Sequence, residues 1–382
     1  MKITILGRGN AGCITALHYG YYTRNLENIS IELIYDPDIS PEKVGQASLL
    51  GLPNLLWLAL GINWYDNPIE ATPKLGILYE NWGTKEKSFA SPFPLHNLGL
   101  HYDPAKLQEV ILNSGYFTVQ KKHIDNYDEI DSDFIFDCRG KPDNWDDYEE
   151  LTNPLNSVIL GQGKSKEADI NWTRAVATPD GWTFVIPNTT QTTSYGYLYN
   201  DKITSTEEAS ANFEKIFSLE KQGIYLNEEV NNLKFKNYAA KKPIIDDRII
   251  LGGNRSFFLE PLESTAVESC LFWARKTFDW IINKSSTPAL ISQDFSKYIH
   301  QIQNFVMWHY MYGSKYDTPF WEAAKNLKIE DSMFYDFLAY SKKLSMADLL
   351  DTNSRFVNES YGQWQLWNFK RWNDGMTLPS SG

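Results

Sequence analysis

The sequence predicts an α/β fold with a parallel sheet near the N-terminus, an inserted antiparallel sheet and a helical C-terminal part. Residues 2–6 and 29–35 are short apolar runs typical of buried strands, and residues 13–23 between them have a helical pattern. A strand, a helix and a second strand within about 35 residues make a βαβ unit. We therefore expect the two strands to pair in parallel through a right-handed crossover.

Later segments extend this prediction. The apolar runs at residues 133–137 and 247–252 have the pattern of further buried strands. Residues 181–186 and 195–199 alternate aromatic with other side chains, as antiparallel strands do. Residues 49–62 form an apolar run too short to span a bilayer, which predicts a core helix. From residue 264 onward the pattern is helical, over residues 264–283, 295–311 and 329–350.

We expect three structural parts from this order. The first, a nucleotide-binding module, takes residues 1–50 with 103–150 and 240–290. The second, a sheet module on the substrate side, takes residues 51–102 with 151–239. The third, residues 291–382, is predicted to be a helical and aromatic cover.

Charge and composition exclude several classes of protein. The 382 residues include 48 acidic and 36 basic side chains, for a net charge of −12. Such a chain lacks the basic surface that nucleic acid or an anionic membrane requires. The three cysteines are widely spaced and the six histidines lack metal-ligand spacing, so we expect no metal site. These features predict a cytoplasmic protein, and they leave a homo-oligomer open.

The first strand runs into the glycine motif GRGNAG at residues 7–12. Gly7 permits a tight turn, Gly9 lets the backbone approach a pyrophosphate, and Gly12 lets the helix and the strand pack closely. Ala11 directly precedes Gly12 in this motif. The helix that follows points its positive end at the phosphates. Asp36 ends the second strand, where an acid binds a ribose hydroxyl. The motif predicts a dinucleotide site, and the alternative is a plain glycine turn.

A second glycine pair, Gly161 and Gly163, does not repeat this motif. Lys166 takes the place of the third glycine, and no regular helix follows. One dinucleotide site without a second suggests bound FAD, with reducing equivalents arriving from elsewhere.

Two other segments have both a structural and a functional interpretation. Residues 71–82 read as a strand with one inward-pointing lysine, Lys74, although most lysines in strands are solvated. Residues 260–265 enter a helix, and Ser264 or Thr265 could simply cap it.

Taken together, the segments resemble the flavin-dependent tryptophan halogenases. The resemblance covers residues 1–325 in family order, and no single segment is specific by itself. The matching segments are GRGNAG at 7–12, VGQA at 44–47, the strand at 74–82, GWTFVIP at 181–187, PLEST at 261–265, and HY at 309–310 followed by DTPFW at 317–321.

This resemblance implies an FAD-binding Rossmann-like module of the aromatic-hydroxylase type. It implies that reduced FAD from a separate flavin reductase, with oxygen, converts halide (chloride, bromide or iodide) to hypohalous acid. Lys74 would relay the halogen to an aromatic or indole-like small molecule, and Glu263 would orient the reacting species. Backbone N–H groups of Thr265 and Ala266 would hold the halide. The implied FAD contacts are Gly7, Gly9, Ala11, Gly12, Asp36, Gln46, Ala47, Asn254 and Val267.

The sequence also departs from the family. Gln46 replaces a glutamate, Phe184 replaces the second tryptophan of WxWxIP, and Ala266 replaces a glycine. His309 is expected to pack or hydrogen-bond inside a helix pair rather than act as a base. The aromatic tail is either a core-covering segment or an aromatic wall over the substrate. Its members are Tyr361, Trp364, Trp367, Phe369 and Trp372.

Two alternatives to a halogenase remain open from the sequence. One is a flavin-dependent aromatic monooxygenase, a hydroxylase of the same fold. The other is a non-catalytic flavin-binding redox module. Neither alternative needs a lysine and a glutamate at the positions of Lys74 and Glu263. This pair therefore favours the halogenase over the hydroxylase and the flavin-binding module.

Overall fold

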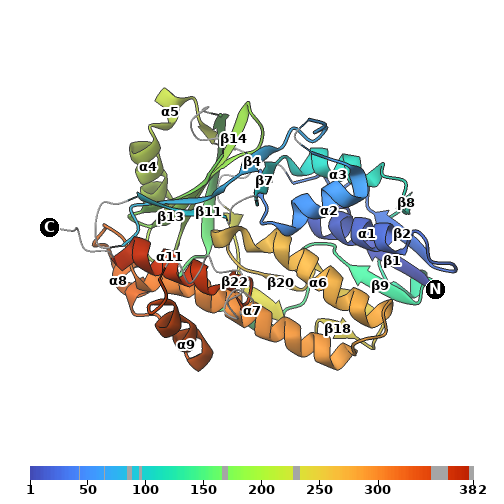
Figure 1. Ribbon diagram of the computed structural model, residues 1–382. Coiled ribbons are helices and arrows are strands. Elements are labelled where there is room, and N and C mark those ends of the chain that lie inside the picture. Colours follow the sequence, from blue (N-terminus) through green and yellow to red (C-terminus); the bar gives the residue numbers. More distant parts are fainter. Residues whose placement is uncertain are drawn as a thin grey trace.

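A six-stranded sheet built around the N-terminal βαβ unit forms one end of the molecule (Figure 1). The computed structural model describes residues 1–42, 44–63, 65–83, 88–93, 97–165, 171–226, 233–345 and 360–377. Strand β1 pairs in parallel with β2 and β9, which confirms the predicted crossover. The sheet order is β18 (Ile244–Ile245), β19 (Ile249–Leu251), β9 (Phe134–Asp137), β1 (Lys2–Leu6), β2 (Ser30–Tyr35) and β8 (Thr118–Lys121).

Helix α1 (Asn10–Thr23) connects β1 to β2 and begins three residues before the predicted residue 13. Gly9 is its N-cap, so the helix starts inside the glycine motif. Helix α1 packs against α6 (Thr265–Ile281), and also against α2 (Gly51–Leu60) and α3 (Pro104–Leu112). The side chain of Asp103 caps α3, because it accepts hydrogen bonds from the N–H groups of Ala105 and Lys106.

An eight-stranded sheet forms the other end of the molecule. Its centre is antiparallel, as predicted for the middle of the chain, since β13 pairs with both β12 and β14. The main path is β15 (Tyr225–Leu226), β11 (Ser157–Lys164), β14 (Thr192–Tyr199), β13 (Gly181–Pro187), β12 (Thr173–Thr178), β5 (Gly76–Glu80) and β6 (Ser88–Pro92), and β16 (Leu233–Lys234) pairs with β11. Helices α4 (Thr206–Phe217) and α5 (Leu219–Gln222) follow β14.

Smaller sheets complete the strand pairing. Strand β7 (Gly99–Tyr102) pairs on one side with β3 (Gln46–Ala47) and on the other with β4 (Thr72–Lys74). This pairing places Lys74 opposite Gly99, on a strand two places from Gln46. The remaining strands are β10 (Tyr148–Glu150), β17 (Tyr238–Ala240) and β20 (Phe257–Phe258) in one sheet, and β21 (Ser360–Tyr361) with β22 (Trp364–Gln365) in another.

The C-terminal part is helical, and its longest members are α6 (Thr265–Ile281) and α7 (Pro288–Met311) (Figure 1). Helix α7 begins before the predicted residue 295, because Thr287 caps it and Pro288 starts its first turn. The predicted helix at 329–350 is shorter, α9 (Ser332–Ser341), and its last five residues lie outside the described chain. Helices α8 (Pro319–Lys325) and α11 (Leu366–Thr377) also lie in the described residues of this part. Among the described residues, no helix has the length and apolarity needed to cross a membrane.

Buried aromatic side chains join the second sheet to the C-terminal helices. Trp82, Trp182 and Trp321 are almost completely buried. Each indole N–H has an acceptor: Trp82 donates to the carbonyl of Ala175, Trp321 donates to that of Thr178, and Trp182 donates to the carboxylate of Glu260. Satisfied indole groups let these large rings pack without an unpaired polar atom.

Glu260 is the buried polar centre of this packing. Its carboxylate accepts hydrogen bonds from the Tyr310 hydroxyl at 2.6 Å, the Leu262 N–H at 3.0 Å and the Trp182 indole at 3.2 Å. Burial raises the pKa of Glu260 to about 7. The residue therefore connects β13, α7 and the turn that precedes α6.

Replacing Glu260 with alanine should destabilise the fold strongly. The change leaves three buried donors without an acceptor, which costs about 3 kcal/mol of unfolding free energy. Chemical denaturation should show this loss, while Glu220→Ala on the exposed surface of α5 should change stability by no more than about 0.5 kcal/mol. Equal stability of the two variants would contradict the assigned role of Glu260.

Candidate active site

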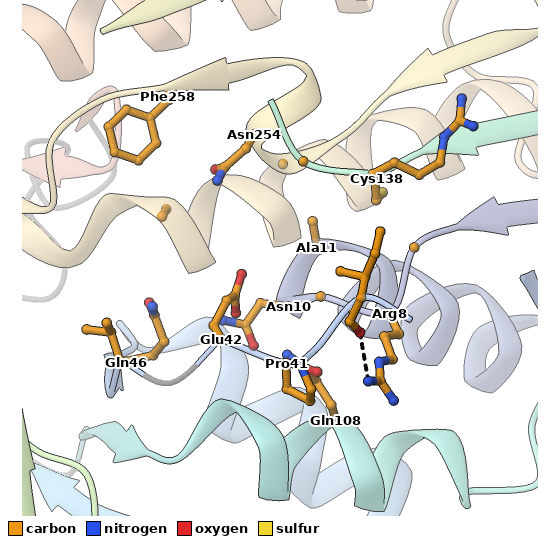
Figure 2. Close-up of a pocket in the computed structure, with 18 of the residues that line it drawn as sticks. Arg8, Asn10, Ala11, Pro41, Glu42, Gln46, Gln108, Cys138, Asn254 and Phe258 are labelled. Atoms are coloured by element: carbon orange, nitrogen blue, oxygen red, sulfur yellow. Dashed lines mark hydrogen bonds between the residues drawn. The ribbon is translucent and has the colours of Figure 1, made fainter. Parts of the chain in front are cut away.

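A cavity of about 510 Å³ lies between the two large sheets (Figure 2). The glycine turn after β1 and the segment around Glu42 line one side, and Asn254 and Phe258 line the other. Apolar side chains of β11, β13 and β14 close one end, namely Val158, Leu160, Phe184, Ile186 and Leu198. One part of the cavity is lined by polar side chains and the other by apolar side chains, so the cavity suits a long ligand with one polar part and one flat apolar part.

The glycine turn has the geometry that its sequence predicts. Gly7 has a φ of 96°, which side chains rarely allow. A Cβ on Gly12 would lie 1.9 Å from the carbonyl oxygen of Gly7, so Gly12 serves close packing and does not line the cavity. A Cβ on Gly9 would meet nothing nearer than 3.7 Å, so the backbone at Gly9 is open to a ligand.

Several buried polar atoms at this cavity have no partner among the described residues. Both amide atoms of Gln108, the side-chain oxygen of Asn10 and the Nε of Arg8 make no hydrogen bond to that part of the chain. All three residues line the cavity. Because buried polar groups are nearly always paired in folded proteins, these atoms indicate a polar ligand. The ribose and phosphate groups of FAD carry the donors and acceptors that such atoms lack.

Asp36 lines the cavity where the sequence predicts a ribose contact. Its carboxylate lies 2.6 Å from Nδ1 of His123, and this hydrogen bond holds the pKa of Asp36 below its usual value. The other ring nitrogen of His123 lies 3.0 Å from Asp125. His123 also lines the cavity, and the sequence analysis gave it no role.

The other predicted contacts divide into two groups. Gln46, Asn254, Ala266 and Val267 line the cavity, together with Gly7, Gly9 and Ala11. Ala47, Gly12 and Thr265 do not line it. Thr265 is buried at the first position of α6, directly before Ala266.

Lys74 is completely buried at the end of β4. Its Nζ donates a 2.7 Å hydrogen bond to the hydroxyl of Ser264 and lies 5.5 Å from the centre of the Phe93 ring. Burial lowers the pKa of Lys74 to about 7, although the nearby carboxylate of Glu263 opposes this effect. The amine is therefore partly neutral at physiological pH.

The turn before α6 has an uncommon backbone. Glu263 and Ser264 have φ values of 71° and 56°, two consecutive left-handed residues that are not glycine. Each such residue costs about 1–3 kcal/mol, and such strain occurs often at functional sites. Ser264 makes no side-chain cap on α6, so the capping alternative is wrong for this residue. Its hydroxyl is instead directed at Lys74.

Both carboxylate oxygens of Glu263 have partners in the C-terminal part. Oε1 lies 3.0 Å from Nε2 of His309, and Oε2 accepts a 3.0 Å hydrogen bond from the indole of Trp364. The Trp364 ring stacks on Phe305 at 3.9 Å. Four of the five aromatic residues of the tail are buried, as in a core-covering segment, and Trp367 is half-buried. Through Trp364 the tail also reaches a predicted catalytic residue.

The same turn borders both parts of the site. Pro261 and Ala266 line the cavity, whereas Lys74 and Glu263 do not. Lys74 reaches this turn through its hydrogen bond to Ser264. Ser264, His309 and Trp364 are the site residues that the sequence analysis did not assign. The only sequence signals for them were the HY segment, which contains His309, and the PLEST segment, which contains Ser264.

The family model for tryptophan halogenases matches residues 2–127 and 99–376. These matches cover most of the chain, so the chain belongs to the tryptophan halogenase family. It is a flavin-dependent halogenase of aromatic substrates, and the family implies FAD as the cofactor. The predicted family, fold class and enzyme class are confirmed.

Individual relatives are distant in sequence. The tryptophan 6-halogenase ThaL of Streptomyces albogriseolus is 21% identical over 437 residues, covering 87% of this chain and 80% of ThaL. The tryptophan 7-halogenase RebH of Lentzea aerocolonigenes is 27% identical over 189 residues, 47% of this chain and 34% of RebH.

Solved structures share the fold. Xcc4156, a flavin-dependent halogenase from Xanthomonas campestris, superposes with a TM-score of 0.79 at 18% identity, covering 99% of this chain and 89% of that one. The tryptophan halogenase from Shewanella frigidimarina gives a TM-score of 0.78 at 17% identity, covering 100% and 90%.

A valine at Gly9 should abolish FAD binding and leave the fold intact. The φ of Gly9 is −62°, which any residue adopts, so the backbone tolerates the change. The branched side chain would occupy the open space through which a pyrophosphate approaches. Titration of flavin fluorescence should show lost binding for Gly9→Val and a smaller loss for Gly9→Ala, with an unchanged melting temperature. Full FAD affinity in Gly9→Val would place the cofactor elsewhere.

Proposed function

We propose that this protein halogenates an aromatic or indole-like small molecule with hypohalous acid relayed by Lys74. The observation that carries the proposal is the Lys74 amine, fully buried, bonded to Ser264 and near Glu263. A buried lysine with a pKa of about 7 suits halogen transfer, whereas aromatic hydroxylation has no use for it.

Gly9, Asp36, Gln108 and Asn254 are suited to hold the polar and ring parts of FAD, because they line the cavity on its two sides. Reduced FAD, supplied by a separate flavin reductase, would provide the electrons with which oxygen converts halide to hypohalous acid. In this proposal, the turn at residues 261–266 keeps the oxidation of halide beside FAD apart from the aromatic substrate beside Lys74.

The first turn of α6 supports a halide site. The first N–H groups of a helix have no acceptor within the helix, and the helix dipole favours an anion there. Ala266, in this turn, faces the cavity, and Thr265 precedes it. We assign their backbone N–H groups to chloride, bromide or iodide.

Lys74 and Glu263 would divide the second half of the reaction. The Lys74 amine would hydrogen-bond the hypohalous acid, or attack its halogen to form an N–halogen bond while the O–halogen bond breaks. In the second case the hydroxide that leaves takes a proton from the amine and departs as water. The Glu263 carboxylate offsets positive charge that develops on the aromatic ring. Ser264 orients the amine through its hydrogen bond.

An indole-like substrate is supported by what already touches Glu263. The Trp364 indole donates to this carboxylate while its face stacks on Phe305. The Glu263 carboxylate thus accepts a hydrogen bond from an indole N–H, the donor group that an indole-like substrate also carries.

Lysine variants test the relay. Lys74→Ala should form no halogenated product from indole, reduced FAD, oxygen and bromide, and Lys74→Arg should also fail because its guanidinium stays charged. Both should still bind FAD. Lys276→Ala, a partly exposed lysine of α6, is the matched control. Mass spectrometry distinguishes the outcomes: unchanged bromination in Lys74→Ala disproves the relay, one added oxygen in the wild type indicates a hydroxylase, and no product indicates a flavin-binding module.

The pH profile of halogenation tests the protonation state of Lys74. Because burial lowers its pKa to about 7, the neutral amine predominates above that pH and the ammonium below it. The rate at saturating indole should therefore rise through pH 7 and level off above pH 8. A rate that falls through this range would show that the ammonium is the active form.

A further inference from the structure

Glu42 is an acidic residue at the cavity that the proposed mechanism does not use. It follows β2 in the chain, and Figure 2 shows its side chain at the cavity beside Asn10. Apart from the chain neighbours of Gly9, one described atom lies within 4 Å of the position that a Cβ on Gly9 would take. This atom is Oε1 of Glu42, at 3.7 Å. A carboxylate oxygen therefore borders the open space at Gly9.

The basic residues at the cavity are paired with groups other than Glu42. Three described lysine and arginine residues line the cavity, and each is bonded to another part of the chain. They are Arg8 with the carbonyl of Ile39, Lys122 with Glu129, and Arg139 with Asp137. The pKa of Glu42 is raised, because the surrounding protein partly removes the carboxyl from water. None of these three cations therefore offsets the charge of Glu42.

The Glu42 carboxylate acts on the start of helix α1. Gly9 is the N-cap of this helix, and Cys13 lies at the end of its first turn. Burial, and after it the charge of Glu42, raise the pKa of the Cys13 thiol. The same two effects raise the pKa of Tyr102 on β7. The carboxylate is therefore near the helix end that the glycine motif presents to a pyrophosphate.

Two anions would share this helix end when FAD is bound. The first N–H groups of a helix and its dipole favour a negative charge, and a pyrophosphate uses both. Glu42 brings a second negative group to the same place, since its oxygen is the described atom nearest to the open side of Gly9. Like charges at this short range repel each other, and a bound ligand excludes the water that would screen them.

We infer that Glu42 limits the affinity of the protein for FAD and thereby speeds the exchange of the cofactor. Reduced FAD from a separate reductase must enter the cavity, and oxidised FAD must leave it. A phosphate site without an opposing carboxylate would release the cofactor more slowly, because differences in affinity act mostly on the rate of dissociation. The inference rests on the proposed use of this cavity for FAD supplied by a reductase.

The variant Glu42→Gln tests the inference, because glutamine has nearly the same size and carries no charge. Titration of flavin fluorescence should show FAD binding that is about tenfold tighter, and stopped-flow measurements should show release slowed by a similar factor. Glu27→Gln is the matched control, since Glu27 is exposed beyond the opposite end of α1. It removes the same charge from the protein and should leave the affinity and the release rate unchanged.

Ligand charge and salt show whether the effect comes from the phosphates. Riboflavin carries no phosphate, so Glu42→Gln should bind riboflavin no more tightly than the wild type does. The gain for FAD should shrink as the salt concentration rises from about 20 mM to about 0.5 M, because ions screen the repulsion. An equal gain for riboflavin, or a gain that salt does not change, would overturn the inference.

A second variant separates the loss of charge from a new contact. Glu42→Ala should also bind FAD more tightly than the wild type, because it lacks the carboxylate. Tighter binding by Glu42→Gln alone would indicate a hydrogen bond from the new amide, and weaker or unchanged binding by both variants would indicate that the carboxylate accepts a hydrogen bond from FAD. Either result contradicts the inference. Failure of the FAD assignment itself gives another pattern, in which the wild type binds no FAD or Gly9→Val keeps full affinity.

Discussion

The hydrogen bond from Lys74 to Ser264 is the interaction on which the two-part site depends. It joins residues 190 positions apart in the sequence and fixes an amine from a short strand against the turn that starts α6. Two left-handed residues make this turn, and their strain is tolerated because buried groups hold both sides of it. This contact attaches the lysine side chain to the cavity wall, in addition to the backbone pairing that holds β4 beside β7.

Two glutamates near this turn have different tasks because their partners differ. Glu260 is surrounded by donors from β13, α7 and the turn itself, which anchor it. Glu263 has one oxygen on an imidazole and the other on an indole. Environment, more than residue type, distinguishes the structural carboxylate of Glu260 from the carboxylate of Glu263, for which we propose a chemical role.

Local patterns in the sequence predicted much of the fold and part of the site. The βαβ unit and the glycine turn follow from spacing, because the chemistry of a tight turn and a buried strand is local. The contacts of Ser264, His309 and Trp364 could not be predicted, since each joins segments far apart in the chain. The left-handed backbone at Ser264 was also hidden, because serine before a helix is usually a cap. The three-part division of the chain remains a prediction.

The small sheet formed by β3, β7 and β4 fixes the distance between the cavity and the strand of Lys74. Ala47 and Thr72 both face His101 across this sheet, so the strand that contributes Gln46 to the cavity and the strand of Lys74 are two spacings apart, about 10 Å. Backbone hydrogen bonds set that length, and side-chain substitutions hardly alter it. In the proposed mechanism, an oxidant formed on the cavity side would have to cross a distance of this order to reach Lys74, so its lifetime in the protein interior would bear on the yield.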